Sequence, residues 1–479
     1  MYKNLDRLSS KDDLCSAFMN LLKPFFEHDS LAVQAQLLMY CCSIYMLNCT
    51  KPIRFMYNHC LKYLSDISLQ NYYNAINKEQ YQDYWRETLI KIAISAIPEC
   101  LRDLPIYLII DDTLIEKIGQ HFEHISILHD HCARNGTSYL SGHCYVSIIL
   151  AIPVLINGNI RYIRIPIEHK LWIPKNQRKN VKNDKKNNDD NSKNTQYQIF
   201  SDDDNKLELA NKLIDNVVKL IGTDHKFILF ADAWYAKAPI TDLIHRSDLK
   251  IAMVCGVRFD AKLYYLPPEY KGRGRKPIYG DVIKIDKLQY VKMPGSPYKI
   301  AYTKGKARIF GDQEVSIFVT KEQNGKPRVF ICTDPTFFAG LDPSILPNVD
   351  KNLAKFLTLN PQFIPLVAYR YRWMVEVVYQ EQKASWGLED YRLKSQNGFT
   401  TLVTLHSILY ALTSLLPFLD QKFAGCVNLS IQDRRGWLGQ ALNIKLILAT
   451  FVDLCENAQN HEDIVNIYNN MSLTDIIAM

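Results

Sequence analysis

The sequence predicts an α/β protein that begins with a helical segment, and the prediction rests on a change of texture near residue 100. Before that point the chain contains long apolar runs at helical spacing, such as ETLIKIAISAI. After it, short runs rich in β-branched residues alternate with turn residues and amphipathic helices. With 479 residues, of which 47% are hydrophobic and 22% charged, the chain can bury the cores of two or three domains.

The strands and helices after residue 100 follow a definite order. The first strand, LPIYLIIDDT, ends in two acids, and two longer strands, CYVSIILAIPVL and NIRYIRIPIEHKLWI, flank a GN turn. The helix KLELANKLIDNVVKLIG follows, and then come the strand HKFILFADAWYA, a helix and the strand KIAMVCGVRF. Because a basic segment of about a hundred residues separates these elements from a last helix, we predict a ribonuclease-H-like fold interrupted by an insertion.

Composition divides the chain into five predicted regions. They are a helical N-terminal domain (1–100), the first part of a catalytic domain (101–260), a basic β-rich insertion (261–362), the catalytic helix with the end of the core (363–420), and a helical C-terminal region (421–479). In the first region, SLQNYYNAIN is polar enough to be a DNA-reading helix, although an ordinary packing helix explains it as well. Residues 175–205 are expected to form a flexible surface loop, because this polar repeat has little apolar surface to bury.

Positive charge is concentrated in the predicted insertion. The whole chain has a formal charge of +7, whereas the segment from Lys262 to Phe310 holds 12 Lys and Arg against 3 Asp and Glu. A basic segment of this size indicates a nucleic-acid partner. Within it, KGRGRKP presents Arg273, Arg275 and Lys276, which we expect to contact the DNA backbone or minor groove. A basic surface turn is the alternative.

The sequence does not have the features of a membrane or secreted protein. Its N-terminus lacks the apolar region of a signal peptide, and polar residues interrupt the apolar segment from Leu402 to Leu419, as in a core helix. The 12 cysteines form no C-x-x-C pair and are expected to be reduced thiols. We therefore expect a cytoplasmic protein with no membrane partner.

Three acids stand out at the ends of strands and on the last helix. Asp112, or its neighbour Asp111, ends the first strand, Asp232 ends the strand HKFILFAD, and Glu376 lies in YRYRWMVEVVYQEQK. Side chains at strand ends emerge at the rim of a sheet, where substrates bind. Converging carboxylates repel one another unless a cation neutralises them, and Mg²⁺ prefers oxygen ligands. Because adjacent strand residues point to opposite faces, Asp111 and Asp112 cannot both hold the metal.

The last helix combines a carboxylate, two cations and a phenol on one face. Steps of about 100° per residue bring Tyr369, Arg372, Glu376 and Lys383 within an arc of about 60°. A solvated helix face with local ion pairs is one interpretation. The other is a surface that handles phosphates, on which the cations and the phenol contact backbone oxygens while the carboxylate holds a metal.

The spacing Tyr369-x2-Arg372-x3-Glu376-x6-Lys383 resembles the Tyr-Arg-Glu-Lys signature of the cut-and-paste DDE transposases of bacterial insertion sequences. DDT and ADAWYA resemble the first and second acidic motifs of that family, and the likeness covers roughly residues 104–416. It implies Mg²⁺-dependent DNA chemistry, with Mn²⁺ as a substitute. The implied metal ligands are Asp112, Asp232 and Glu376, and the implied DNA contacts near the cut are Tyr369, Arg372 and Lys383.

The resemblance also implies a biological role. The protein would bind the terminal inverted repeats of its element, pair the ends as a homodimer, cut them and join their 3′-ends to target DNA on the bacterial nucleoid. Two alternatives remain open at this point. One is a DNA-binding relic or repressor without chemistry, and the other is a metal nuclease of the same fold that does not join strands.

Two aromatic features bear on how such a protein handles DNA. Trp234 and Tyr235 directly follow the second acid, and we interpret them as packing beneath the site. The predicted insertion contains no tryptophan, whereas some members of the family stack a flipped base on one there. The candidates for a stacking surface are Tyr264, Tyr265, Tyr270 and Tyr279.

A histidine-rich segment is the remaining candidate for a metal site. HDHC at residues 129–132, together with His143 and Cys144, contains ligand types that suit zinc. It lacks the usual spacing of four zinc ligands and lies between two predicted core strands. We interpret these residues as structural.

Overall fold

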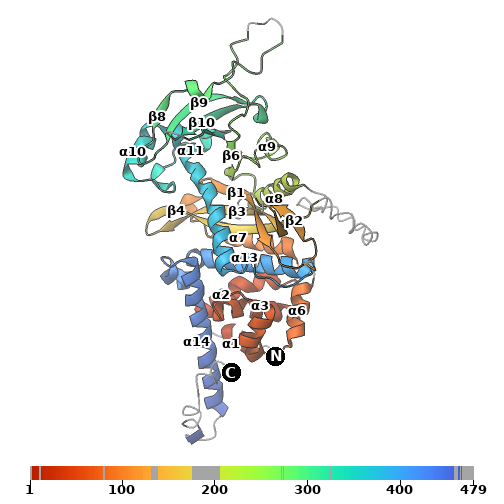
Figure 1. Ribbon diagram of the computed structural model, residues 1–479. Coiled ribbons are helices and arrows are strands. Elements are labelled where there is room, and N and C mark those ends of the chain that lie inside the picture. The colour runs from red at the N-terminus through yellow and green to blue at the C-terminus, as the bar shows by residue number, and fades with distance from the viewer. Residues whose placement is uncertain are drawn as a thin grey trace. The chain divides into compact units, whose positions relative to one another are not determined.

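The computed structural model of the chain describes residues 3–9, 12–78, 81–119, 121–130, 139–174, 205–270, 272, 275–322, 325–457, 462, 463 and 465. The chain divides into two compact units. The helical unit comprises Met1–Ala96, Ile115–Gly142 and Tyr379–Met479, and the sheet unit comprises Ile97–Leu114 and His143–Val378. The ribbon in Figure 1 shows both, coloured by residue number.

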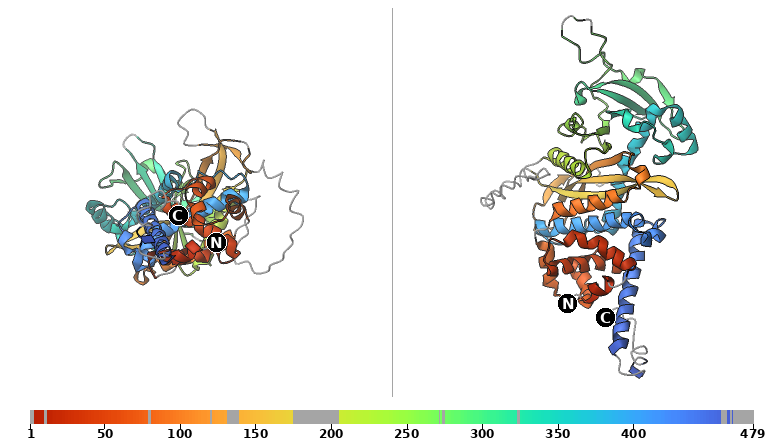
Figure 2. Two further views of the ribbon diagram at one scale, coloured as in Figure 1. Left: turned by 90° about the horizontal axis from the view of Figure 1, so that it is seen from below. Right: turned by 180° about the vertical axis from the view of Figure 1, so that it is seen from behind.

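Both ends of the described chain contribute to the core of the helical unit. Its helices are α1 (Lys3–Ser9), α2 (Leu14–Leu22), α3 (Leu31–Met46), α4 (Ile53–Met56), α5 (Lys62–Leu64), α6 (Leu69–Asn77), α7 (Gln82–Ser95), α13 (Gln396–Leu419) and α14 (Ile431–Asn457). Helix α3 packs along α14, and α13 packs against α6 and α7, as the red and blue helices of Figures 1 and 2 show. A single apolar core therefore joins segments that are hundreds of residues apart.

Helix α6 contains the polar segment SLQNYYNAIN. Ser68 caps its N-terminus by accepting a hydrogen bond from the backbone N–H of Asn71. Tyr72, Ala75 and Ile76 are buried on one face of the helix. The structure thus agrees with the packing interpretation of this segment.

Helix α13 is the one helix of the described residues that is long and apolar enough to cross a membrane. Its most apolar window has a mean hydropathy of 1.7, and 78% of that window is buried inside the protein. A helix that is apolar all round is expected at the centre of a helical core. Its burial against α6 and α7 agrees with the core helix predicted from Leu402 to Leu419.

The sheet unit contains the strands and the helix that the sequence predicts after residue 100. Its strands are β1 (Ile106–Glu116), β3 (Tyr139–Ile156), β4 (Asn159–Trp172), β5 (Phe227–Ala231), β6 (Ile251–Val257), β7 (Leu263–Tyr264), β8 (Tyr290–Lys292), β9 (Lys299–Ala307), β10 (Glu314–Lys321) and β11 (Arg328–Cys332). Its helices are α8 (Lys206–Ile221), α9 (Ile240–Leu243), α10 (Lys351–Leu359), α11 (Ile364–Ala368) and the first turns of α12 (Trp373–Ser385). The predicted α/β class is confirmed.

The strands form one mixed sheet in the order β3-β1-β5-β6-β11-β10-β9-β7, with β4 on β3 and β8 on β9. The short strand β2 (Ser126–His129) pairs with the first residues of β3, within the helical unit. Strands β1, β5 and β6 are parallel, whereas β3 and β4 form an antiparallel hairpin. Asn157 and Gly158 turn this hairpin with positive φ angles of 50° and 75°, which suit a two-residue turn.

The basic segment after β6 continues the same sheet with antiparallel strands. Strand β11 pairs with β6, β10 pairs with β11, and β9 pairs with β10. Where β7 pairs with β9, a Cβ on Gly305 would lie 2.4 Å from the carbonyl oxygen of Tyr264, so only glycine fits there. The predicted region 261–362 therefore contains β7 to β11 and α10.

Helix α8 begins where the described chain resumes after the polar repeat. Asn205 caps it by accepting hydrogen bonds from the backbone N–H groups of Leu207 and Glu208, and the Glu208 side chain returns a bond to the cap. Apart from Asn205, the predicted flexible loop at 175–205 lies outside the described residues.

Candidate active site

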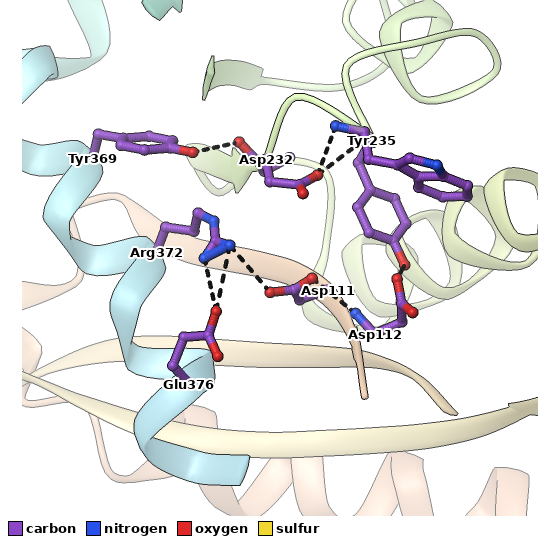
Figure 3. Close-up of polar contacts among 9 residues, drawn as sticks. Asp111, Asp112, Asp232, Tyr235, Tyr369, Arg372 and Glu376 are labelled. Carbon is purple, nitrogen blue, oxygen red and sulfur yellow. Dashed lines mark hydrogen bonds and ion pairs between the residues drawn. The ribbon is translucent and has the colours of Figure 1, made fainter. Parts of the chain in front are cut away.

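The end of strand β1 directs two neighbouring acids to opposite faces of the sheet. The residues from Ile106 to Ile110 are buried, as expected of a strand covered on both faces. Asp111 and Asp112 follow, and the alternation of a strand sends their side chains in opposite directions. Figure 3 shows Asp111 turned towards Arg372 and Asp112 turned towards Tyr235.

Asp232 lies one residue beyond strand β5, next to β1. Ile109 of β1 pairs with Phe230 of β5, and continuing this parallel register by two residues brings Asp111 level with Asp232. The Oδ1 atom of Asp232 accepts hydrogen bonds from the backbone N–H groups of Trp234 (2.9 Å) and Tyr235 (3.1 Å). This turn fixes the direction of the carboxylate at the sheet edge.

The third acid reaches the same region from helix α12. Residues Tyr369–Arg372 form a 3₁₀ turn, and α12 starts only at Trp373, whereas a single α-helix was expected. In a 3₁₀ turn side chains three residues apart eclipse one another, so Tyr369 and Arg372 lie on one side. Glu376 follows in the first turn of α12, while Val375 and Val378 are buried on its core face.

Arg372 joins the acids of two separate elements. Its Nη2 atom lies 3.4 Å from Oδ2 of Asp111, and its Nη1 atom lies 3.3 Å from Oε1 of Glu376. The side chains of Arg372 and Asp111 are 18% and 13% exposed, so solvent screens this pair only partly. Figure 3 shows the guanidinium between the two carboxylates.

Burial disfavours the ionised form of Asp111. Burial raises its pKa, Arg372 opposes the rise and Asp232 adds to it, so that the pKa reaches about 7. Burial acts to lower the pKa of Arg372, but the charges of Asp111, Asp232 and Glu376, together with Tyr369, outweigh burial and raise it. The charges of Asp111 and Asp232 therefore repel each other at this edge, and Arg372 offsets part of the cost at Asp111.

Tyr369 contacts the strand that carries the second acid. Its hydroxyl donates a hydrogen bond of 3.1 Å to the carbonyl oxygen of Ala231, the residue before Asp232. Burial raises the pKa of this phenol, so it stays protonated as a donor. The hydroxyl that the sequence analysis expected to contact a phosphate therefore donates to the backbone of the segment that carries Asp232.

The sequence-based choice of Asp112 as metal ligand disagrees with this geometry. Asp112 binds Lys206 at 2.8 Å, Tyr235 at 3.0 Å and Cys144 at 3.4 Å, on the side of β1 away from Arg372. The neighbour that the sequence left as an alternative, Asp111, faces Arg372. Because side chains alternate along a strand, one of the two must point away, and the packing of the 3₁₀ turn before α12 brings Arg372 to Asp111.

The donor set suits a hard divalent cation, but its members are not gathered around one point as they stand. Among the residues that the structure describes, no three His, Cys, Asp or Glu side chains form a group that could hold a metal ion. Arg372 now supplies positive charge to Asp111 and Glu376. Carboxylate oxygens are the ligands that Mg²⁺ prefers, so the chemistry of the acids fits this ion once Glu376 turns from the guanidinium.

The remaining predicted contact residues are placed as follows. Lys383 lies in the last turn of α12, about two helical turns beyond Glu376. Arg275 and Lys276 are exposed in the basic segment, and Arg273 lies outside the described residues. Each of these cations therefore stays a predicted DNA contact.

The candidate aromatic residues differ in exposure. Tyr265 is 39% and Tyr270 is 41% exposed, whereas the rings of Tyr264 and Tyr279 pack on each other with centroids 4.7 Å apart. Tyr235 is fully buried, as the packing interpretation requires, but Trp234 beside it is 41% exposed.

The histidine-rich segment gives no zinc site in the described residues, where no metal-binding group is found. His143 is buried, and the buried thiol of Cys144 donates to Asp112. His131 and Cys132 lie outside the described residues.

Lys206 is a residue of the site region that the sequence analysis missed. It occupies the first turn of α8, where the helix dipole disfavours a cation. Its ammonium binds Asp112 and lies over the rings of Trp172 (4.9 Å) and Trp234 (5.5 Å). A lysine at a helix N-terminus is the signal that would have pointed to an acidic partner.

Comparison with known proteins identifies the family. A solved cryo-EM structure of the piggyBac transposase in a synaptic complex with hairpin DNA is similar over 98% of this chain and 85% of that chain, with a TM-score of 0.41 and 9% sequence identity. No curated protein matches the sequence. Residues 34–302, more than half of the chain, match the family described as DDE superfamily endonuclease. On that match, the chain belongs to the DDE superfamily of endonucleases.

Proposed function

We propose that the protein is the DNA transposase of a bacterial insertion sequence, and that Asp111, Asp232 and Glu376 are its catalytic carboxylates. One observation carries the proposal: a single guanidinium, that of Arg372, is ion-paired with acids from β1 and from α12. In this proposal Asp111 replaces Asp112 as the first acid. The family match, which includes Asp111 and Asp232 in its residues 34–302, supports endonuclease chemistry for the chain.

The topology supports a ribonuclease-H-like core. Along the chain, three strands, a helix, a strand, a helix and a strand follow one another as the sequence predicted, and in the sheet they have the order β4-β3-β1-β5-β6, with β3 and β4 antiparallel and the other three parallel. We assign β7 to β11 to an insertion between β6 and the last helix. The acids then lie at the edge of the sheet where the parallel strands end.

The chemistry proposed is phosphodiester cleavage and strand transfer. Asp111, Asp232 and Glu376 would hold Mg²⁺, or Mn²⁺ in its place. When bound, such ions activate a water or a 3′-hydroxyl and stabilise the leaving oxygen. Arg372 releases Glu376 and contacts a DNA phosphate instead, because a guanidinium matches the geometry of phosphate oxygens as well as that of carboxylates.

The proposed partner is double-stranded DNA, both the terminal inverted repeats of the element and the target. Exposed cations in the basic segment, among them Arg275 and Lys276, support contacts to the DNA backbone. Lys383 is proposed to contact phosphates near the cut. Pairing of two ends calls for two copies of the chain, so we propose a homodimer on DNA, acting in the bacterial cytoplasm at the nucleoid.

The test is an assay on a labelled duplex that carries one element end. We expect purified protein with Mg²⁺ to cut the end and to join its 3′-hydroxyl to a second duplex. Binding without cutting would instead indicate a repressor or relic, and cutting without joining would indicate a nuclease. An Asp232→Ala variant serves as the control for contaminating nucleases.

A further inference from the structure

The side chain of Asp112 is held by three donors behind the proposed site. Tyr235 donates its hydroxyl to Oδ1 at 3.0 Å, while Lys206 (2.8 Å) and Cys144 (3.4 Å) bind Oδ2. Tyr235 and Cys144 are almost completely buried, and the side chain of Lys206 is 19% exposed. A carboxylate with this many fixed donors has one orientation.

Tyr235 connects this cluster to the second acid. Its backbone N–H donates to Oδ1 of Asp232 at 3.1 Å, and its hydroxyl donates to Asp112. One buried residue therefore binds the carboxylate of Asp232 at one end and that of Asp112 at the other. Figure 3 shows the ring of Tyr235 extending from the Asp232 loop to Asp112.

We propose that Asp112 is a positioning residue, which acts through Tyr235 to hold the Asp232 carboxylate in the direction needed for metal binding. The inference rests on the proposed function, since it concerns the same site. A buried phenol requires an acceptor, and a carboxylate oxygen is a strong one. Without that acceptor the turn after β5 loses the hydrogen bond between Tyr235 and Asp112 that ties it to β1, and the direction of the Asp232 carboxylate is held less firmly.

A purely structural cluster makes a different prediction. If the hydrogen bond between Tyr235 and Asp112 contributed only to folding, its loss would lower thermal stability and leave the metal affinity of the folded protein unchanged. If it positions Asp232, its loss weakens metal binding in addition. Residues that orient metal ligands typically change metal affinity by about 10- to 100-fold when they are replaced.

The experiment compares Tyr235→Phe with a matched control, Tyr162→Phe, in the full-length protein. Tyr162 lies in the same unit, is buried, and donates its hydroxyl to the carbonyl oxygen of Pro105 at 2.9 Å, just before β1. Both changes remove one buried hydroxyl, so both should lower the melting temperature. Mn²⁺ binding without DNA is measured from the electron paramagnetic resonance signal of the free ion, and cleavage of an end-bearing duplex is measured over a range of Mg²⁺ concentrations.

We expect Tyr235→Phe to weaken Mn²⁺ binding about tenfold or more and to raise the Mg²⁺ concentration needed for cleavage, while Tyr162→Phe changes neither. Asp112→Ala should repeat the effect of Tyr235→Phe, and it serves as the second variant if the first fails to fold. Wild-type Mn²⁺ affinity in Tyr235→Phe, or an equal loss of Mn²⁺ affinity in Tyr162→Phe, overturns this inference and leaves the proposed function standing. A wild-type protein that neither binds Mn²⁺ nor cuts overturns the proposed function with it.

Discussion

The guanidinium of Arg372 lies 3.4 Å from the carboxylate of Asp111, and this ion pair connects the 3₁₀ turn before α12 with strand β1. The same guanidinium lies 3.3 Å from Glu376. In the protein without DNA, Arg372 thus supplies the positive charge that the two acids need.

Glu376→Gln tests whether the last acid holds a metal. The change keeps the shape of the side chain and removes its charge, so binding of the end should persist while Mg²⁺-dependent cleavage falls by several orders of magnitude. Gel shifts in Ca²⁺ and cleavage in Mg²⁺ on the same labelled end measure the two effects. Cleavage within about tenfold of wild type would mean that Glu376 only pairs with Arg372.

Arg372→Ala should lower the melting temperature of the metal-free protein and increase the rise in melting temperature that Mn²⁺ causes. Without the guanidinium, Asp111 is left as a buried charge without its cation, so the metal-free protein should melt earlier. Mn²⁺ should then raise the melting temperature by more than it does in wild type, because the ion takes over that role. Arg370→Ala is the matched control, since Arg370 donates to the carbonyl oxygens of Pro347 and Asn348 and not to the acids. Equal responses of the two variants to Mn²⁺ would contradict the prediction.

The raised pKa of Asp111 predicts a pH dependence of the metal-free protein. Its pKa is 3.8 as an ordinary carboxyl and about 7 in the fold. Between these values the folded state binds more protons than the unfolded state, so the contribution of this group to stability falls as the pH rises from about 4 to 7. The Asp111→Asn variant lacks this effect.

Thermal unfolding in a chelator checks that pH dependence. The melting temperature of wild type minus that of Asp111→Asn should decrease from pH 4.5 to pH 8. Parallel curves across that range would show that Asp111 ionises with its ordinary pKa in the fold.

The basic segment should govern the salt dependence of DNA binding. Changing Arg273, Arg275 and Lys276 together to Ala should weaken end binding and reduce the slope of log affinity against log salt by about 2–3, since each phosphate contact contributes about 0.9. Lys91→Ala, on helix α7, removes an exposed cation elsewhere and should leave the slope unchanged. An unchanged slope in the triple variant would remove this segment from the DNA interface.

Local patterning determined the elements of this fold. The strands β1, β3, β4, β5 and β6 and the helix α8 appear where alternating or continuous apolar runs predicted them. The spacing of apolar residues in such a run shows which face of the element is buried, so a strand can be predicted without knowing which element packs against it. The candidate acids Asp232 and Glu376 were found in the same way, from their places after a strand and on a helix.

Only the tertiary structure decided which acid of the first strand faces Arg372 and the proposed site. The sequence shows that Asp111 and Asp112 point in opposite directions, because side chains alternate along a strand. It does not show which face the last helix covers, since that contact joins segments hundreds of residues apart. The packing of α12 places Arg372 on the side of Asp111. On the other side, Asp112 accepts a hydrogen bond from Tyr235 and pairs with Lys206. The grouping of the first helices with the last ones into one core was hidden for the same reason: long-range packing leaves no local pattern in the sequence.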